Sequence, residues 1–398
     1  MSDVSTLPRF PFDTPAHMDA EPAHAVLRAA GPVAQVQLSD GTPVWVAVGY
    51  EAVRRVLTDP QFSRAASATP GAPTITPAID QPDVMVSMDP PEHTRLRRLV
   101  AGAFTTREME RRRPRIQEIA DGLLDAMAAQ GPPADLVARF AFPLPITVLC
   151  DLLGMPYEDI DRVREWSEIT QSIDVHPREV VAGAARALGA YVAGLVAAKR
   201  DRPGDDLLTK LIQARDQDDR LSEAELVQHT TGILIAGHDT TANQLALSLL
   251  TLFRHPDQLA LLRARPELVP GAVEELLRFT RLLTSAFGRM ATADVVLQGV
   301  TVPAGATVFA VLAAANRDER VQPEPDRLDI TRTGVQQLAF GVGPHVCLGA
   351  PLARVELQVG LASLLRRFPS LALAVPESDL GWKQGNFIRG VRALPVAW

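Results

Sequence analysis

The sequence predicts a mainly α-helical fold with small β-sheets, of the α+β class, and three observations lead to this expectation. Helical patterns follow one another from residue 116 to residue 279. Strand-like stretches are short and cluster near residues 33–48 and again after residue 295. Apolar residues make up 46% of the 398 residues, which is ample for a sizeable core. We expect one domain, residues 1–398, with a helix-rich lobe and a smaller β-rich lobe built from both ends of the chain.

The first hundred residues predict a short helix, a hairpin and a long irregular stretch. Residues 20–30 are helical in pattern, and residues 33–38 and 44–48 read as two strands joined by a turn at 39–43. A further helix is expected over 50–57. Residues 63–88 are rich in proline, alanine, threonine and glycine and show no clear period. Loops of this length are uncommon in compact chains and usually serve function.

A long helix is predicted from Ser222 to about Arg254, because Ser222 and Glu225 have the spacing of a capping box. A mid-helix glycine costs about 1 kcal/mol relative to alanine, so Gly237 requires a structural reason. Ala236 and Gly237 would let a flat ligand approach, and Asp239 and Thr240 follow at once. The plain alternative is that the Thr240 hydroxyl bonds back to the Ala236 carbonyl and bends the helix.

The last third of the chain combines a helix over 267–279, short strands and a final helix over 351–368. Glu275 and Arg278 are three residues apart on the first of these helices, which is usually a surface ion pair. Apolar neighbours argue against a wholly exposed face, and a buried pair needs further hydrogen bonds. Arg327 is the candidate third member. Strands are expected at 295–297, 300–302 and 307–312, with a turn at 298–299.

Composition excludes several classes of function. The net charge of −7 disfavours nucleic acid as a main partner. Cys150 and Cys347 are far apart, which argues against a disulfide framework and is typical of a reducing compartment. Cys150 lies in an apolar helical run and is expected in the core. Residues 1–13 carry no apolar signal region, and no stretch reaches the roughly 18 apolar residues of a membrane span. We therefore expect a cytoplasmic monomer without a membrane anchor.

The most informative stretch is residues 338–349, a glycine-punctuated loop that contains Cys347 and precedes the last helix. Three glycines in nine residues suggest a loop pressed against something flat. Pro351 suits the first turn of a helix, which places Cys347 near a helix N-terminus. The partial positive charge there favours a thiolate, which serves as a metal ligand or a nucleophile. The alternative is a buried structural cysteine, the common state of a free cysteine.

The pattern Phe340-Gly341-x-Gly-x-His345-x-Cys347-x-Gly349 resembles the haem-binding signature of the cytochrome P450 family. This resemblance covers nearly the whole chain and implies the cytochrome P450 fold and a haem b cofactor. It also implies that Cys347 is the axial thiolate and metal ligand of the haem iron. Thiolate ligation favours cleavage of the O–O bond, so the resemblance points to oxygen activation.

Other motifs fit the same resemblance. Residues 89–97 match the family's Asp-Pro-Pro-x-His-x-x-x-Arg segment, which implies that His93 and Arg97 hold a haem propionate. On spacing alone, these two side chains would be a solvated helix face. The resemblance implies further cofactor contacts at Arg289, His345, Phe340, Gly341, Gly349, Ala236 and Gly237. It also implies oxygen activation by Asp239 and Thr240, and a structural triad of Glu275, Arg278 and Arg327.

The function implied is a monooxygenase that hydroxylates or epoxidises a bulky hydrophobic molecule. Its electrons would come from a ferredoxin and an NAD(P)H-dependent ferredoxin reductase. The resemblance is closest to bacterial enzymes of secondary metabolism, which act on macrolides, polyketides, terpenoids or cyclic peptides. The resemblance implies that residues 63–88 roof the substrate pocket. The expected pocket edges are predominantly apolar: Met85, Val86, Ile233, Leu282, Leu283, Phe287, Phe387 and Ile388.

Three alternatives are kept from the sequence. A peroxide-using enzyme would not need the Asp239–Thr240 pair, whose presence counts against it. An enzyme that couples carbon to carbon or nitrogen without inserting oxygen has the same motifs, and only the product mass separates it. A haem-thiolate sensor or binding protein would show no NAD(P)H turnover.

Overall fold

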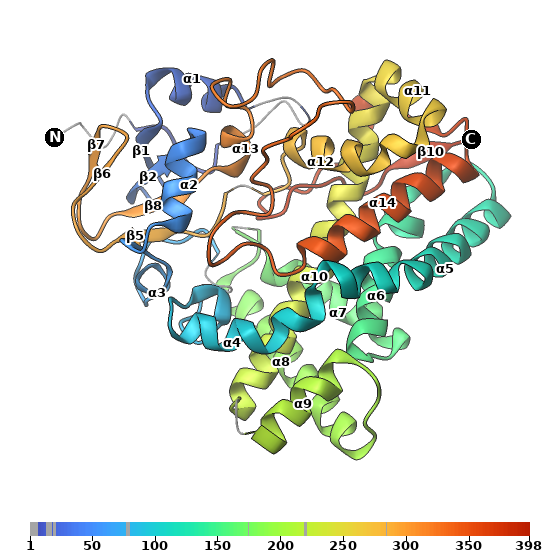
Figure 1. The fold of residues 1–398 in the computed structure, drawn as a ribbon, viewed down its shortest axis with the longest axis horizontal. Coiled ribbons are helices and arrows are strands. Elements are labelled where there is room, and N and C mark those ends of the chain that lie inside the picture. Colours follow the sequence, from blue (N-terminus) through green and yellow to red (C-terminus); the bar gives the residue numbers. More distant parts are fainter. Residues whose placement is uncertain are drawn as a thin grey trace.

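The fold is organised around one long helix, α10 (Glu223–Arg254), in a computed structural model that describes residues 7–12, 18, 21–76, 80–173, 175–218, 221–283 and 285–398. Helices dominate this part of the chain, and most of the strands gather on the left of the view in Figure 1. The prediction of a mainly α fold with small sheets is therefore confirmed. The start of α10 is fixed as expected, because the Ser222 hydroxyl accepts from the Glu225 N–H and the Glu225 carboxylate accepts from the Ser222 N–H.

A five-stranded sheet joins the two ends of the chain. Its strands lie in the order β1 (Val33–Gln37), β2 (Pro43–Ala47), β8 (Thr307–Ala310), β5 (Arg289–Ala291) and β3 (Phe62–Ser63). The predicted hairpin is β1 with β2, and β2 then pairs in parallel with β8, placing Trp45 opposite Val308. This parallel pair of strands joins the N-terminal hairpin to a strand from the last third of the sequence.

Two smaller sheets complete the strand content of the described residues. They are β6 (Val295–Leu297) with β7 (Val300–Val302), and β4 (Ala134–Asp135), β10 (Pro395–Ala397) and β9 (Ala372–Leu373). The turn predicted between β6 and β7 is present, with Gln298 and Gly299 both at positive φ. Such a two-residue turn matches the twist of the strands it joins.

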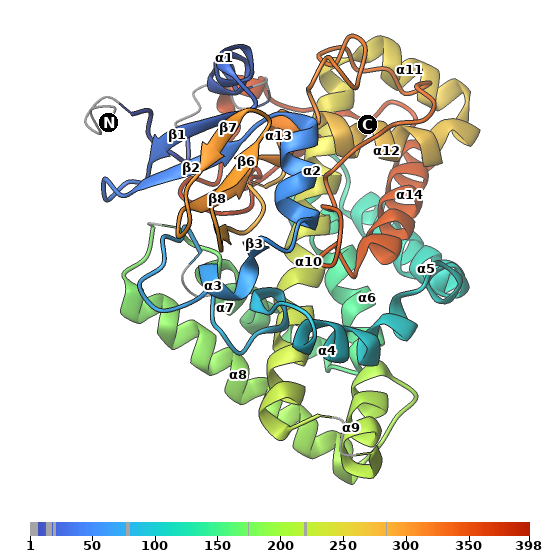
Figure 2. The same cartoon turned by 60° about the vertical axis from the view of Figure 1, so that its left-hand side comes forward.

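In chain order the remaining helices are α1 (Pro22–Ala30), α2 (Tyr50–Thr58), α3 (Arg64–Ser67), α4 (Glu92–Ala101), α5 (Thr106–Gln130), α6 (Pro143–Leu153), α7 (Ile160–Thr170), α8 (Arg178–Asp201), α9 (Leu207–Asp218), α11 (Pro256–Ala264), α12 (Val269–Phe279), α13 (Leu312–Ala315) and α14 (Ala350–Arg367). Of these helices, the short α1, α2, α3 and α13 lie beside the five-stranded sheet, and most of the others surround α10 (Figure 2). The irregular stretch predicted at 63–88 contains only the short α3 and a 3₁₀ turn, η2 (Met85–Ser87), among its described residues.

The largest buried cluster lies where α5, α6, α10 and α14 meet. Gly360 on α14 allows this approach, because an added Cβ would lie 3.1 Å from Leu245 of α10 and 3.2 Å from Leu144 of α6. The cysteine loop leads directly into α14, so the packing of α14 against α10 sets where the loop sits relative to the central helix.

Among the described residues, α8 alone is long and apolar enough to cross a membrane by length and composition. About 28% of its apolar window is buried inside the structure. A single helix of this kind is weak support for a membrane span, because core helices of soluble proteins meet the same criterion.

Candidate functional site

The cysteine loop is a set of tight turns anchored to the helix behind it. The Cys347 N–H donates to the Phe340 carbonyl at 2.8 Å, and the Ala350 N–H donates to the Cys347 carbonyl at 3.4 Å. Gly341 and Gly343 have φ of +68° and +81°, which other residues rarely adopt. A Cβ at Gly343 would lie 2.7 Å from the Leu57 carbonyl oxygen. At Gly343 the absent side chain therefore makes room for the end of α2, which the loop pattern alone did not indicate.

Cys347 is exposed to solvent, but many protein atoms lie around its sulfur. This crowding by protein removes part of the solvation of a thiolate and raises the pKa of the thiol. Hydrogen bonds from Gly349 and Ala350 and the charges of Arg97 and Arg354 act in the opposite direction. The helix N-terminus therefore does not by itself produce a thiolate here. A bound metal ion deprotonates a coordinating thiol outright, so an accessible, enclosed cysteine suits a metal ligand.

Cys150 provides the contrast expected from sequence. It is buried on α6 within the main apolar cluster. Burial raises the pKa of its thiol to about 12. A thiol in that environment is an inert core residue.

Four basic side chains converge beside the cysteine. The His93 and His345 rings lie 4.1 Å apart between centroids, and Arg97 Nη2 donates to the Val346 carbonyl at 2.6 Å. Arg289 is buried on β5, and within the described part of the chain its guanidinium donates to the carbonyls of Phe287 and Gly288, at 3.4 and 3.3 Å. The sequence motifs therefore do come together in space.

Four basic side chains, which we call the basic cluster, lie close together here and would bind an anion favourably: His93, Arg97, Arg289 and His345. Burial and the neighbouring Arg64 lower the pKa of Arg289 to about 9. Burial, Arg289 and His93 lower the pKa of His345 to about 2. The nearby carboxylate of Asp80 already pairs with Arg64, a different residue. A ligand with two carboxylates that also offers a metal to Cys347 fits this donor set, and haem has both features.

The middle of α10 presents small residues and a hydroxyl. Ala236 is exposed and Gly237 and Thr240 are half-buried. The Thr240 hydroxyl donates to the Ala236 carbonyl at 2.8 Å, which is the back-bond considered as the plain alternative. A hydroxyl that donates to the helix still has its oxygen free to accept, so the bond does not exclude a role in proton transfer.

The glycine at 237 has a packing reason that the sequence pattern did not indicate. An added Cβ would lie 3.1 Å from Leu149 on α6. The missing side chain makes room for Leu149, because α10 packs closely on α6 at this point. Ala236, the neighbouring residue, is the one whose side chain is open to solvent.

Asp239 is buried and its carboxylate has two partners. Asn243 Nδ2 donates to Asp239 Oδ1 at 2.8 Å, and Lys383 Nζ donates to the same oxygen at 3.2 Å. Neither partner was expected from sequence. Asn243 is four residues along the same helix and could have been found from that spacing. Lys383 is 144 residues away, and no local pattern indicates it.

The residues of the expected pocket edge differ in burial. Six of them are half-buried: Met85, Val86, Ile233, Leu282, Leu283 and Phe287. Phe387 and Ile388 are only 4% and 3% exposed, and the Phe387 ring stacks on Phe287 with 5.3 Å between the ring centroids. In this structure Phe387 and Ile388 therefore pack in the core beside Phe287 and present little surface to a substrate.

The expected triad requires one correction. Glu275 and Arg278 form a fully buried two-bond ion pair, with N–O distances of 2.7 and 2.8 Å. The third cation is Arg332, whose Nε lies 3.3 Å from Glu275 Oε1. Arg327 instead points outward and pairs with Glu324 at 3.0 Å. The Arg327 side chain is 59% exposed, so its guanidinium takes no part in the buried group. Arg327 contributes its backbone carbonyl, which accepts hydrogen bonds from Arg278 and Arg332.

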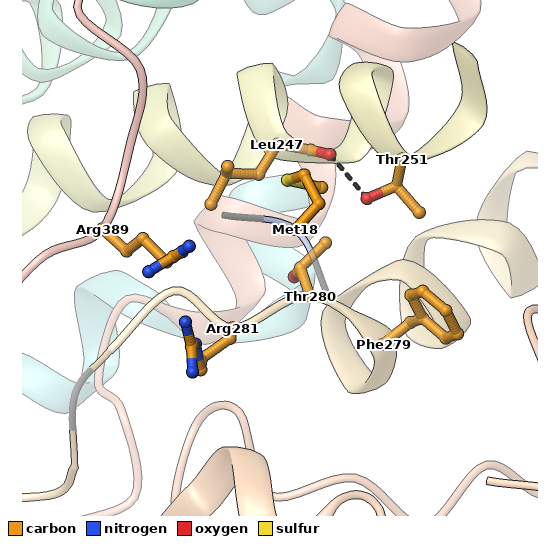
Figure 3. Close-up of a pocket in the computed structure, with 7 residues that line it drawn as sticks. All are labelled: Met18, Leu247, Thr251, Phe279, Thr280, Arg281 and Arg389. Atoms are coloured by element: carbon orange, nitrogen blue, oxygen red, sulfur yellow. Dashed lines mark hydrogen bonds between the residues drawn. The ribbon is translucent and has the colours of Figure 1, made fainter. Parts of the chain in front are cut away.

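A small cavity lies elsewhere, between the end of α12, the N-terminal segment and the C-terminal segment (Figure 3). Its volume is about 10 Å³, the lower limit for one water molecule. Arg281 beside it pairs with Glu21 at 2.9 Å. A cavity of this size holds no organic substrate, so it belongs to the packing of the N-terminal segment.

Comparison with known proteins gives consistent matches. The family model described as Cytochrome P450 matches residues 193–379. The chain is 49% identical to "Nocardicin C N-oxygenase" of Nocardia uniformis subsp. tsuyamanensis, over 98% of each chain. It is 46% identical to "Mycinamicin IV hydroxylase/epoxidase" of Micromonospora griseorubida, covering 99% of this chain and 100% of that one.

Solved structures agree. The LnmA cytochrome P450 hydroxylase from the leinamycin biosynthetic pathway of Streptomyces atroolivaceus S-140 is 46% identical, with a TM-score of 0.90. The alignment covers 98% of this chain and all of that one. The relatives therefore span the whole described architecture, the cysteine loop included.

Proposed function

The chain belongs to the cytochrome P450 family and is a haem monooxygenase, and from this we propose how its own residues serve that activity. The observation that carries the proposal is the basic cluster beside an accessible, enclosed cysteine. We propose that Cys347 is the axial ligand and that His93, Arg97, Arg289 and His345 hold the two propionates. The cofactor of this proposal is haem b.

Other residues around the proposed haem have supporting roles. Phe340, Gly341 and Gly349 would form the loop on the cysteine side, where the Gly349 and Ala350 N–H groups bond the sulfur. Ala236 would face the haem from α10, with Gly237 allowing α10 to approach α6. A haem held by Cys347 would supply oxygen activation: with two electrons and two protons, one atom of O2 would enter the substrate and the other would leave as water.

Asp239 and Thr240 are the proposed proton-handling residues. The Thr240 oxygen can accept a hydrogen bond while its hydroxyl donates to Ala236, and rotation lets it donate instead. It would order the water nearest to the reacting oxygen. The Asp239 carboxylate would pass protons to that water from the solvent side. A positioned acid of this kind typically contributes about 10²–10⁴-fold to a rate.

We propose a bulky hydrophobic secondary metabolite as the substrate, of the macrolide, polyketide, terpenoid or cyclic-peptide class. Relatives named for nocardicin C, mycinamicin IV and leinamycin biosynthesis support this class. The half-buried apolar side chains around α10 support a hydrophobic pocket. The names of the relatives favour hydroxylation or epoxidation, and coupling without oxygen insertion is not favoured.

The cellular setting is part of the same proposal. Enzymes of this family act on small molecules with O2 and redox partners. We propose a ferredoxin and an NAD(P)H-dependent reductase as these redox partners, because an enzyme of this family needs electrons from outside its haem site. We further propose one domain, a cytoplasmic monomer, and no membrane or nucleic-acid partner; the net charge of −7 supports the last point.

Spectroscopy of the haem tests the site. The reduced, CO-bound protein should show the red-shifted Soret band of thiolate ligation, C347A should lose it, and C150A should keep it as the matched control. An unchanged spectrum in C347A would refute the ligand assignment. A ligand screen by haem absorption would then rank the substrate classes, since a bound substrate that displaces the iron-bound water changes the spectrum.

A further inference from the structure

The carboxylate of Asp239 is held by a lysine from the C-terminal segment. Lys383 Nζ lies 3.2 Å from Asp239 Oδ1, and the two side chains are 8% and 11% exposed. Asn243 Nδ2 bonds the same oxygen at 2.8 Å. Both bonds therefore hold Oδ1 from one side, and charge attraction is strong in such a poorly solvated position. No step of the proposed mechanism has yet used this lysine.

A second carboxylate shares the lysine. Glu168 Oε1 on α7 lies 3.6 Å from Lys383 Nζ, and its side chain is 40% exposed. An exposed ion pair is worth little because water and salt screen it. The buried partner, Asp239, is also the nearer one. The ammonium therefore serves mainly Asp239, with Glu168 as a weaker partner on the solvent side.

The backbone around Lys383 fixes its position independently of the ion pairs. The Lys383 N–H donates to the Gly390 carbonyl at 2.9 Å, and the Ile173 N–H beyond the end of α7 donates to the Gly385 carbonyl at 2.7 Å. The Arg389 N–H donates to the Leu282 carbonyl at 2.8 Å. The segment that carries Lys383 is thus bonded to the end of α7 and to the stretch that follows α12, and these bonds fix the position from which the ammonium reaches Asp239.

We propose that Lys383 is a positioning residue for Asp239, which holds the carboxylate in place on the proton path along α10. The inference rests on the proposed role of Asp239 in proton handling and adds a group that fixes the position of this carboxylate. Without the ammonium, the poorly solvated Asp239 side chain would lose the only charged partner that the structure shows within 4 Å among the described residues, and it would turn away from its present position.

The first test measures coupling in the haem-loaded enzyme with its reductase system and a substrate found by the ligand screen. K383M should give several-fold less product per NAD(P)H and more peroxide, with unchanged substrate affinity in the haem absorption titration. K383R should restore most of the coupling, and E168Q should remain close to wild type. K210M is the matched control, because Lys210 is exposed and pairs with the exposed Asp205.

The second test does not depend on activity. Melting temperatures of wild type, K383M, D239N and the double variant form a cycle, and residues in contact give non-additive effects. K383M should lower the melting temperature less in the D239N background than in wild type. These measurements need only folded protein, so they test the contact between Lys383 and Asp239 even when K383M does not retain haem.

The outcomes separate the two proposals. If D239N uncouples the enzyme and K383M does not, or if the melting temperatures are additive, the role of Lys383 is refuted. If D239N itself remains fully coupled, the proton-handling role of Asp239 is refuted and the role of Lys383 falls with it.

Discussion

Replacing Glu275 by alanine removes the carboxylate on which two guanidinium groups depend. Glu275 and Arg278 are both fully buried, and Glu275 Oε1 also accepts from the Asp329 N–H and from Arg332. Removing one side of a buried pair leaves an uncompensated charge and costs about 3–5 kcal/mol. Unfolding entropy of about 2.1 cal/mol/K per residue gives about 0.84 kcal/mol/K for 398 residues. The melting temperature should therefore fall by about 4–6 °C.

The assay is thermal unfolding together with haem content of the purified protein, and both should fall in E275A. The chain offers a matched pair of controls. R327A removes an exposed side chain and should change stability by less than about 0.5 kcal/mol. R332A removes the third cation of the buried group and should fall between R327A and E275A. If R327A were as damaging as R332A, or if E275A kept full haem content, the assignment of this buried group would be wrong.

Three further predictions concern the helix α10 and the response to acid. T240A should bind substrate almost normally, but it should form less product and more peroxide for each NAD(P)H consumed. T231A removes the same kind of hydroxyl-to-carbonyl bond on the same helix and should form as much product per NAD(P)H as wild type. A T240A variant with the product yield of wild type would contradict the proton-path assignment. In G390A the added Cβ would lie 1.7 Å from Asn243 Oδ1, so the Asn243 side chain would have to move and the Asp239 carboxylate would lose its hydrogen bond. This variant should therefore form less product per NAD(P)H. A product yield equal to that of wild type would show that the Asn243 bond is not needed. Burial and Arg281 lower the pKa of His24 to about 3 in the folded protein, from about 6.5 in the unfolded chain. Below pH 6.5 the unfolded chain therefore binds more protons than the folded protein, and the free energy of unfolding falls as the pH falls. At pH 5.5 this one histidine should cost about 1.4 kcal/mol, and melting curves of H24Q should decline less between pH 7 and 5.5 than those of wild type.

Local patterns predicted the framework of the site well. The capping box at Ser222 and the long helix behind it depend on groups three residues apart, and both are present. The hairpin of β1 and β2 and the two-residue turn at Gln298 and Gly299 follow from alternation and turn chemistry. The cysteine loop identified the family because its residue types are set by its own tight backbone.

Where the structure shows more than the reasoning from sequence, the deciding contact is distant in the chain. Gly237 is small because Leu149 of α6 occupies the adjacent space, and that neighbour lies 88 positions earlier in the numbering. Phe387 and Ile388 read as pocket residues but are buried, because the C-terminal segment packs behind Phe287. Hydrophobicity alone cannot tell which face of a wall a side chain occupies.

The sequence by itself determined the fold class, the cysteine ligand candidate and the basic residues around it, since each depends on spacing within one helix or loop. The tertiary structure decided which partners those residues take. Arg332 and not Arg327 completes the buried group on Glu275, and Lys383 reaches Asp239 from the far end of the chain. The physical reason is that a charge pair depends on distance and on exclusion of water. Both are set by how whole elements pack, and neither is visible in the spacing of residues along the chain.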